Sequence, residues 1–150
     1  RRVLAKMDVV VPGRVLDDND VVLVEYEGGA TGCYWTSQFA IGHDNDLRVR
    51  IYGENGSILW AQEECEKVTM IDRDGTIVER HRGGGGIEPA AAKYGRSFME
   101  CLHAKKDGTF EPGMIDFPTV HDGAEGVRFV QACLQSNQQG NAWVTMDENA

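Results

Sequence analysis

The sequence predicts an α+β fold, in which a mostly antiparallel, open-faced β-sheet carries two helices packed on one face. Three observations lead to this expectation. Seven short segments with alternating apolar and polar residues precede any helical pattern. Turn-forming glycine, proline and asparagine residues separate these segments. Two longer segments with helical spacing follow, and a last strand-like segment closes the pattern.

The predicted strands fill the first half of the chain. Gly28-Gly29, in which both residues accept a positive φ, predicts a hairpin turn. The polar corner Gly42-His43-Asp44-Asn45 and the tight turn at 53–56 separate three strands that we expect to form an antiparallel meander. Together, the strand candidates are residues 3–11, 21–27, 30–39, 46–52, 57–62, 67–72 and 76–81.

Two segments in the second half have helical spacing. Residues 88–106 place a proline in the first turn, and residues 119–136 begin with Thr119 and Asp122 in the pattern of a capping box. Residues 142–146 predict a final strand. The glycines at 83–86 predict a break in the chain rather than a phosphate-binding loop, because they complete neither the dinucleotide fingerprint nor a Walker A motif.

Length and composition favour one domain, residues 1–150, and exclude several classes of protein. The net charge is −9 and the 15 basic residues are scattered, whereas a nucleic-acid binder needs a concentrated positive surface. The four cysteines form no C-x-x-C pair, which predicts reduced thiols rather than a zinc site or a disulfide framework. No apolar run approaches the roughly 18 residues that cross a bilayer. We therefore expect a cytoplasmic protein with neither a nucleic-acid nor a membrane partner.

The sequence contains no complete catalytic constellation. It has no G-x-S-x-G or H-E-x-x-H motif, and its four histidines are isolated. No catalytic, cofactor-binding or metal-ligating residue is therefore predicted. His43 is the candidate for a ligand contact, because it lies in a polar corner between two predicted strands, where loops often carry binding residues. The alternative is that His43 is an exposed turn residue.

The strand after this corner has two different faces. Val49 and Ile51 share a face that we expect to meet a packed core. Arg48, Arg50 and Tyr52 share the other face, whose long polar side chains suit a partner surface.

Several motifs, in this order and spacing, resemble the C-terminal domain of the Gfo/Idh/MocA family of NAD(P)-dependent oxidoreductases. The resemblance covers most of residues 8–146. The motifs are Val11-Pro12-Gly13-Arg14, the strand from Gly32 to Gln38, Asn45-x-Leu47-Arg48-x-Arg50-x-Tyr52-Gly53-x-x-Gly56 with Leu59-Trp60 and Gln62-Glu63, Phe117-Pro118-Thr119-Val120-x-Asp122-Gly123-x-x-Gly126-Val127-Arg128-Phe129, and Ala142-Trp143-Val144.

The resemblance implies that a second domain carries the chemistry. Family members are two-domain enzymes whose N-terminal Rossmann domain binds NAD or NADP and supplies a lysine in a Glu-Lys-Pro motif, and an Asp-x-x-x-His motif completes the site. This chain contains none of these motifs, so we expect no cofactor in it. Its start at Arg1 suggests a piece of a longer polypeptide. Lys93-Tyr94-Gly95-Arg96 stands where relatives often carry Gly-His-Pro-Glu-Gly, so no substrate contact is assigned there.

The resemblance therefore implies the substrate-side and oligomerisation domain of a dehydrogenase for a sugar-like or polyol-like small molecule, inactive as an isolated chain. His43 and Asn45 are the predicted substrate-side residues. Arg48, Arg50 and Tyr52 are the predicted subunit contact of a homo-oligomer that forms through the exposed sheet face. The alternative is a stand-alone, dimerising interaction module without catalysis.

Overall fold

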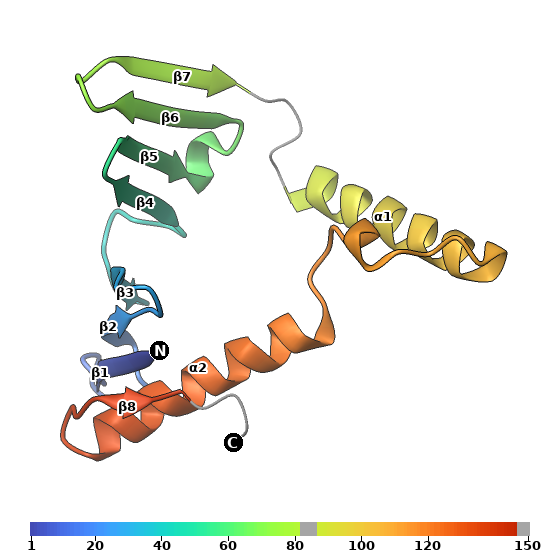
Figure 1. The fold of residues 1–150 in the computed structure, drawn as a ribbon. Helices are drawn as coiled ribbons and strands as arrows, with labels where there is room; N and C mark the ends of the chain where they lie inside the picture. Colours follow the sequence, from blue (N-terminus) through green and yellow to red (C-terminus); the bar gives the residue numbers. More distant parts are fainter. Residues whose placement is uncertain (82–86, 147–150) are drawn as a thin grey trace. The chain divides into compact units, whose positions relative to one another are not determined.

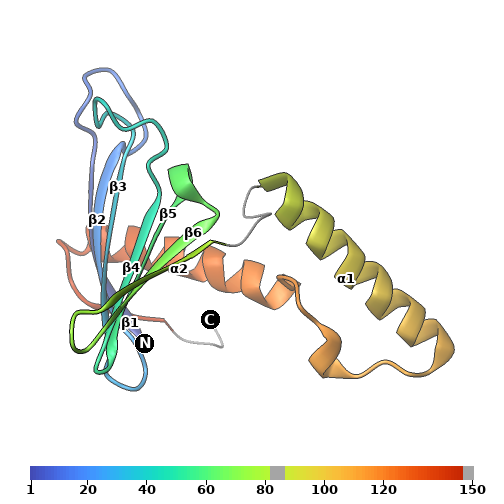
Figure 2. The ribbon, with the colours of Figure 1, turned by 90° about the horizontal axis from the view of Figure 1, so that it is seen from above.

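The computed structural model describes residues 1–81 and 87–146, and the glycine run at 83–86 lies outside this part. The chain divides into two compact units, residues 1–42 with 118–150 and residues 43–117 (Figures 1 and 2). Each unit contains a four-stranded antiparallel sheet and one of the two described α-helices. The predicted α+β class, with antiparallel sheet and two helices, is confirmed.

The first unit is built on a sheet in the order β3-β2-β1-β8. The strands are β1 (Arg2–Asp8), β2 (Asn19–Glu25), β3 (Thr31–Ser37) and β8 (Val144–Thr145). Helix α2 (Val120–Gln138) packs against β1 and β8 (Figure 1). Because side chains alternate along a strand, one face of the sheet buries its small apolar residues under α2. This core consists of Val3, Ala5, Val22, Val24, Ala132, Cys133 and Val144.

Helix α2 is held at both ends by side-chain hydrogen bonds. At its start, the Thr119 hydroxyl accepts the Asp122 backbone N–H and the Asp122 carboxylate accepts the Thr119 N–H at 2.7 Å, which confirms the predicted capping box. Near its end, the buried Ser136 hydroxyl accepts the Ala5 N–H at 2.8 Å and donates to the Ala142 carbonyl at 2.6 Å. Ser136 thereby joins the helix to β1 and to the segment that leads into β8.

The second unit contains a sheet in the order β4-β5-β6-β7. Its strands are β4 (Arg48–Gly53), β5 (Gly56–Ala61), β6 (Lys67–Asp72) and β7 (Ile77–His81), and a short 3₁₀ helix, Gln62–Glu64, follows β5. Gly56 has φ of 151°, and a Cβ at this position would lie 2.3 Å from the Ile71 carbonyl oxygen of β6. The tight β4–β5 turn therefore requires glycine there.

Helix α1 (Ile87–Asp107) packs against the segment that follows it, which includes a 3₁₀ turn at Pro112–Met114. The rings of Phe98 and Phe117 meet edge to face at 5.8 Å, and the buried Cys101 thiol donates to the Met114 carbonyl at 3.4 Å. None of the helices in the described residues is both long and apolar enough to cross a membrane.

The structure bears on two details of the predicted strands. The β4–β5 hairpin is confirmed within the second unit, and β3 pairs with β2 within the first unit, so the predicted pairing of β3 with β4 stays a prediction. The connection at 38–47 is longer than the roughly two to five residues of a hairpin loop. Strand β1 also ends at Asp8 rather than at 11, because the buried Asp18 carboxylate accepts the N–H groups of Val10 and Val11.

Candidate functional site

A bridging carboxylate organises the corner that precedes β4. Asp46 Oδ2 lies 2.5 Å from His43 Nδ1, and Asp46 Oδ1 lies 2.6 Å from Arg48 Nε. The Asp46 side chain is 20% exposed, whereas the His43 side chain is 57% exposed. One partly buried carboxylate thus holds the ring of His43, three residues before it, and the guanidinium of Arg48, two residues after it.

The backbone of this turn is strained. Asn45 and Asp46 have φ of 54° and 26°, values that residues other than glycine adopt infrequently. Asparagine and aspartate tolerate this region better than most residues, and such conformations cluster at functional sites. The reversal at Asn45 and Asp46 turns the chain sharply enough for the Asp46 carboxylate to reach back to His43.

The charge of Asp46 determines how the His43 ring is presented. Hydrogen bonds from Arg48 and then from His43 lower the pKa of the Asp46 carboxyl below its usual value. An ionised carboxylate can only accept hydrogen bonds, so His43 Nδ1 carries the hydrogen in this pair. The second ring nitrogen, Nε2, is then available to accept a hydrogen bond from a hydroxyl group, or to donate one when the ring is protonated.

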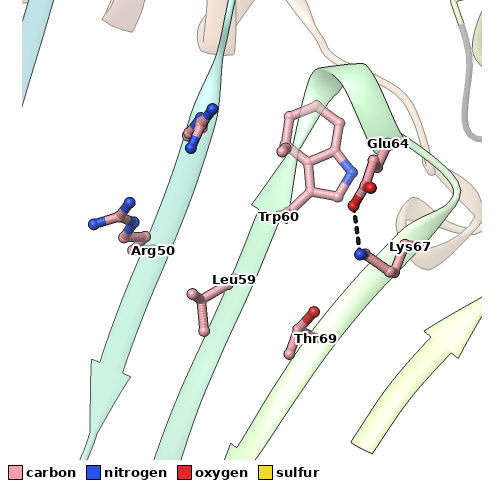
Figure 3. Close-up of a pocket in the computed structure, with 8 residues that line it drawn as sticks. Arg50, Leu59, Trp60, Glu64, Lys67 and Thr69 are labelled. Atoms are coloured by element: carbon pink, nitrogen blue, oxygen red, sulfur yellow. Dashed lines mark ion pairs between the residues drawn. The ribbon is translucent and has the colours of Figure 1, made fainter.

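The predicted interface residues lie on one face of the second sheet. Arg48, Arg50 and Tyr52 alternate along β4, and Tyr52 is 73% exposed. The two arginines also line a hollow of about 140 Å³ on this face (Figure 3). The other residues that line it are Leu59, Trp60, Ala61, Glu64, Lys67 and Thr69.

The opposite face of the same sheet carries apolar side chains that are exposed within the second unit. We expected Val49 and Ile51 to meet a packed core, but they are 43% and 57% exposed, and Ile58 beside them is 40% exposed. Their alternation on one face is as predicted. The prediction that this face is covered is not met within the described residues of the second unit.

A model of a known protein family matches nearly the whole chain. The family model for the C-terminal alpha/beta domain of the oxidoreductase family, that of the Gfo/Idh/MocA proteins, matches residues 1–146. The chain belongs to this family. The match confirms the resemblance inferred from the motifs and extends it to the first strand.

Individual members of the Gfo/Idh/MocA family are similar over most of the chain. An uncharacterized oxidoreductase of Bacillus subtilis is 30% identical over 86% of this chain. The structure of an oxidoreductase from Sinorhizobium meliloti is 30% identical over 97% of the chain, with a TM-score of 0.80. An inositol dehydrogenase homolog from Azotobacter vinelandii, in complex with NADH and myo-inositol, is 28% identical over 95% of the chain, with a TM-score of 0.86.

The chain spans less than half the length of each of these proteins. It covers 38% of the Bacillus protein, 46% of the Sinorhizobium chain and 43% of the Azotobacter chain. The matched part of each relative is thus less than half of its length, and the family model that matches this chain is that of the C-terminal alpha/beta domain.

The structure adds residues that the sequence analysis did not select. The sequence analysis selected His43 and Asn45 but not Asp46. The spacing of three residues between His43 and Asp46 could have indicated that their side chains pair across a turn. Asn45 is exposed, and what the structure shows of it is its backbone reversal. Lys67 and Thr69 share the hollow with the arginines because β5 lies between β4 and β6, a pairing that no local pattern indicates. The described residues contain no group of three or more potential metal ligands.

Proposed function

We propose that this chain is the substrate-side and oligomerisation domain of an NAD(P)-dependent dehydrogenase that acts on a sugar-like or polyol-like substrate. The family match over residues 1–146 is the observation that carries the proposal. The Azotobacter relative, solved with a nicotinamide cofactor and myo-inositol, supports the cofactor and substrate class. An N-terminal Rossmann domain would supply cofactor binding and the catalytic groups, so residues 1–150 act as one wall of the substrate pocket.

In this proposal the corner before β4 faces the substrate. His43 and Asn45 are its substrate-side residues, and Asp46 is a positioning residue that fixes the His43 ring. A hydroxyl-rich substrate offers many hydrogen-bond donors, and His43 Nε2 is suited to accept from one of them. Polar groups placed in this way select against analogues that lack the matching hydroxyl.

The β4 face that carries Arg48, Arg50 and Tyr52 is the proposed contact between subunits of a homo-oligomer. Arginine and tyrosine are enriched at protein interfaces, where long or aromatic side chains bury area and still place polar groups. The open face with Val49 and Ile51 favours the alternative of a stand-alone interaction module, because exposed apolar surface often marks association.

The decisive experiment compares the isolated chain with the complete protein from the same reading frame. We expect the 150-residue chain to bind no NADH in a fluorescence titration, and the complete protein to reduce NAD⁺ or NADP⁺ with at least one polyol or sugar, with myo-inositol tested first. Tight, specific NADH binding by the isolated chain would contradict the proposal that a separate Rossmann domain binds the cofactor. A complete reading frame without a Rossmann domain would favour the interaction module.

Substitutions in the complete enzyme test the corner. His43→Ala is expected to raise KM by about tenfold, the loss of roughly one substrate hydrogen bond, with a smaller change in kcat. Asp46→Asn is expected to raise KM less than His43→Ala and to change the ¹⁵N shifts of the His43 ring as its tautomer redistributes. The matched control is His103→Ala, an exposed helix histidine that should leave both constants unchanged. Equal KM values for all three variants would place the substrate elsewhere.

A further inference from the structure

Two aspartates at the start of β2 lie in opposite surroundings. The buried Asp18 carboxylate accepts the N–H groups of Val10 and Val11, at 2.7 Å and 3.0 Å, and these bonds hold the base of the loop between β1 and β2. Asp20 lies two residues farther along. Because side chains alternate along a strand, Asp20 shares the sheet face of the buried Val22, which α2 covers. One carboxylate is thus supplied with backbone donors, whereas the other is directed towards the core.

Asp20 has few partners for a charged group. Its Oδ1 is shielded from solvent and has no hydrogen-bond partner in the described part of the chain. Its Oδ2 lies 3.5 Å from the Thr36 hydroxyl on β3, the strand paired with β2, which is the outer limit of a hydrogen bond. A charged oxygen that is buried without a donor is costly, so this geometry favours the neutral carboxylic acid.

The charged and titratable groups that face Asp20 strengthen this preference. Burial, then the negative charge of Asp17 and a hydrogen bond that joins the two carboxyl groups, raise the pKa of Asp20. Asp8, at the end of β1, adds a second negative charge, although it is itself paired with Lys6 at 2.6 Å. From α2, the Cys133 thiol faces Asp20, and burial and then the charge of Asp20 raise the pKa of that thiol.

We propose that Asp17 and Asp20 share one proton in the folded chain, and that loss of this proton as the pH rises loosens the loop tip at 12–17. With the proton present, one carboxyl group donates to the other carboxylate, and this charge-assisted hydrogen bond ties the loop to β2. Without it, two carboxylates that can only accept hydrogen bonds repel each other. Asp17 is exposed and can turn to solvent. The loop tip also carries the exposed side chains of Val15 and Leu16, so the proton controls how this apolar tip is held.

Replacing Asp20 with asparagine imitates the neutral acid at every pH. The amide keeps the shape of the carboxyl group and can donate to the Asp17 carboxylate. The stability that the shared proton provides is fully present below the unfolded pKa of the carboxyl, about 4, and is lost as the pH rises through the raised folded pKa. We therefore expect Asp20→Asn to match the urea midpoint of the unchanged chain at pH 3, and to exceed it by about 0.5 M at pH 8.

A matched control separates the pair from the general repulsion in an acidic chain. Asp72→Asn removes one charge from an exposed aspartate at the end of β6, and its urea midpoint should stay close to that of the unchanged chain at both pH values. Equal gains in Asp20→Asn and Asp72→Asn at pH 8 would show relief of general repulsion and overturn the proposal. A lower midpoint for Asp20→Asn at pH 8 would overturn it as well.

Side-chain ¹³C spectra of the full chain follow each carboxyl group directly. We expect Asp17 and Asp20 to titrate as a coupled pair with one step above the usual carboxyl pKa of about 4, and the amide signals of Val15 and Leu16 to shift in the same step. Asp17→Asn should abolish that step. Independent titration of both carboxyl groups at ordinary values, or loop amides that do not follow the step, would refute the proposal. Neither measurement uses dehydrogenase activity, so failure of the proposed enzyme function would be seen separately.

Discussion

Replacing Ser136 with alanine removes a hydroxyl that joins three parts of the first unit. Ser136 is 0% exposed, and its Oγ accepts the Ala5 N–H at 2.8 Å while donating to the Ala142 carbonyl at 2.6 Å. The Ala5 N–H lies at a position where β1 extends past the short strand β8, so the serine takes the place of a ladder partner. Without the hydroxyl, this buried donor has no remaining acceptor that the structure describes.

The expected loss of stability in Ser136→Ala combines the loss of the two Ser136 hydrogen bonds with a smaller gain in helix propensity. An unsatisfied buried N–H costs about 1–3 kcal/mol, and the loss of the second, part-buried bond adds about 1 kcal/mol. Alanine is a better helix former than serine, so the substitution stabilises the last turns of α2 by roughly 0.5 kcal/mol. The net loss in the free energy of unfolding should be about 2 kcal/mol, or roughly 4–8 °C in Tm for a chain of this size.

Urea denaturation followed by far-UV circular dichroism measures this difference. The matched control is Ser57→Ala on β5, a half-buried serine for which the described structure shows no side-chain hydrogen bond, and its stability should stay within about 0.5 kcal/mol of the unchanged chain. If Ser136→Ala were as stable as Ser57→Ala, the bridge between α2, β1 and the β8 approach would contribute nothing, and our account of this sheet edge would be refuted.

Two further predictions concern the same unit. Burial raises the pKa of the Cys133 thiol to about 11. At pH 8 a disulfide reagent should therefore label the exposed Cys33 rapidly, and Cys133 only after urea unfolds the chain. Equally fast labelling of both cysteines would contradict the buried position of Cys133. Hydrogen bonds from Val10 and then Val11 lower the pKa of Asp18, so its stabilising effect is present above the carboxyl's unfolded pKa, near 4, and is lost as the pH falls through its folded pKa. Asp18→Asn should therefore unfold in less urea than the unchanged chain at pH 7, with a smaller difference at pH 3, and a pH-independent difference would show that the charge has no role.

The candidate site could be predicted in part. The corner residue His43 and the arginine face of β4 follow from the alternation of the strand and from the polar loop before it. Asp46 did not follow, because its importance depends on positive φ values at two adjacent residues, and these place its carboxylate between His43 and Arg48. The hollow did not follow either, because it requires β6 to pair with β5, and such pairings are non-local.

The sequence by itself determined the local elements of this protein. Alternation and turn residues determine the strands, and the capping box of Thr119 and Asp122 determines where α2 begins. The ordered motifs identify the Gfo/Idh/MocA family. Each of these patterns can be recognised from residues that lie close together in the chain. Only the tertiary structure decided that β1 pairs with β8, that Ser136 completes the edge of β1, and that Arg50 is left without a partner among the described residues. These features depend on contacts between residues distant in sequence, and the free energy of such contacts is set by packing and burial that local patterns do not encode.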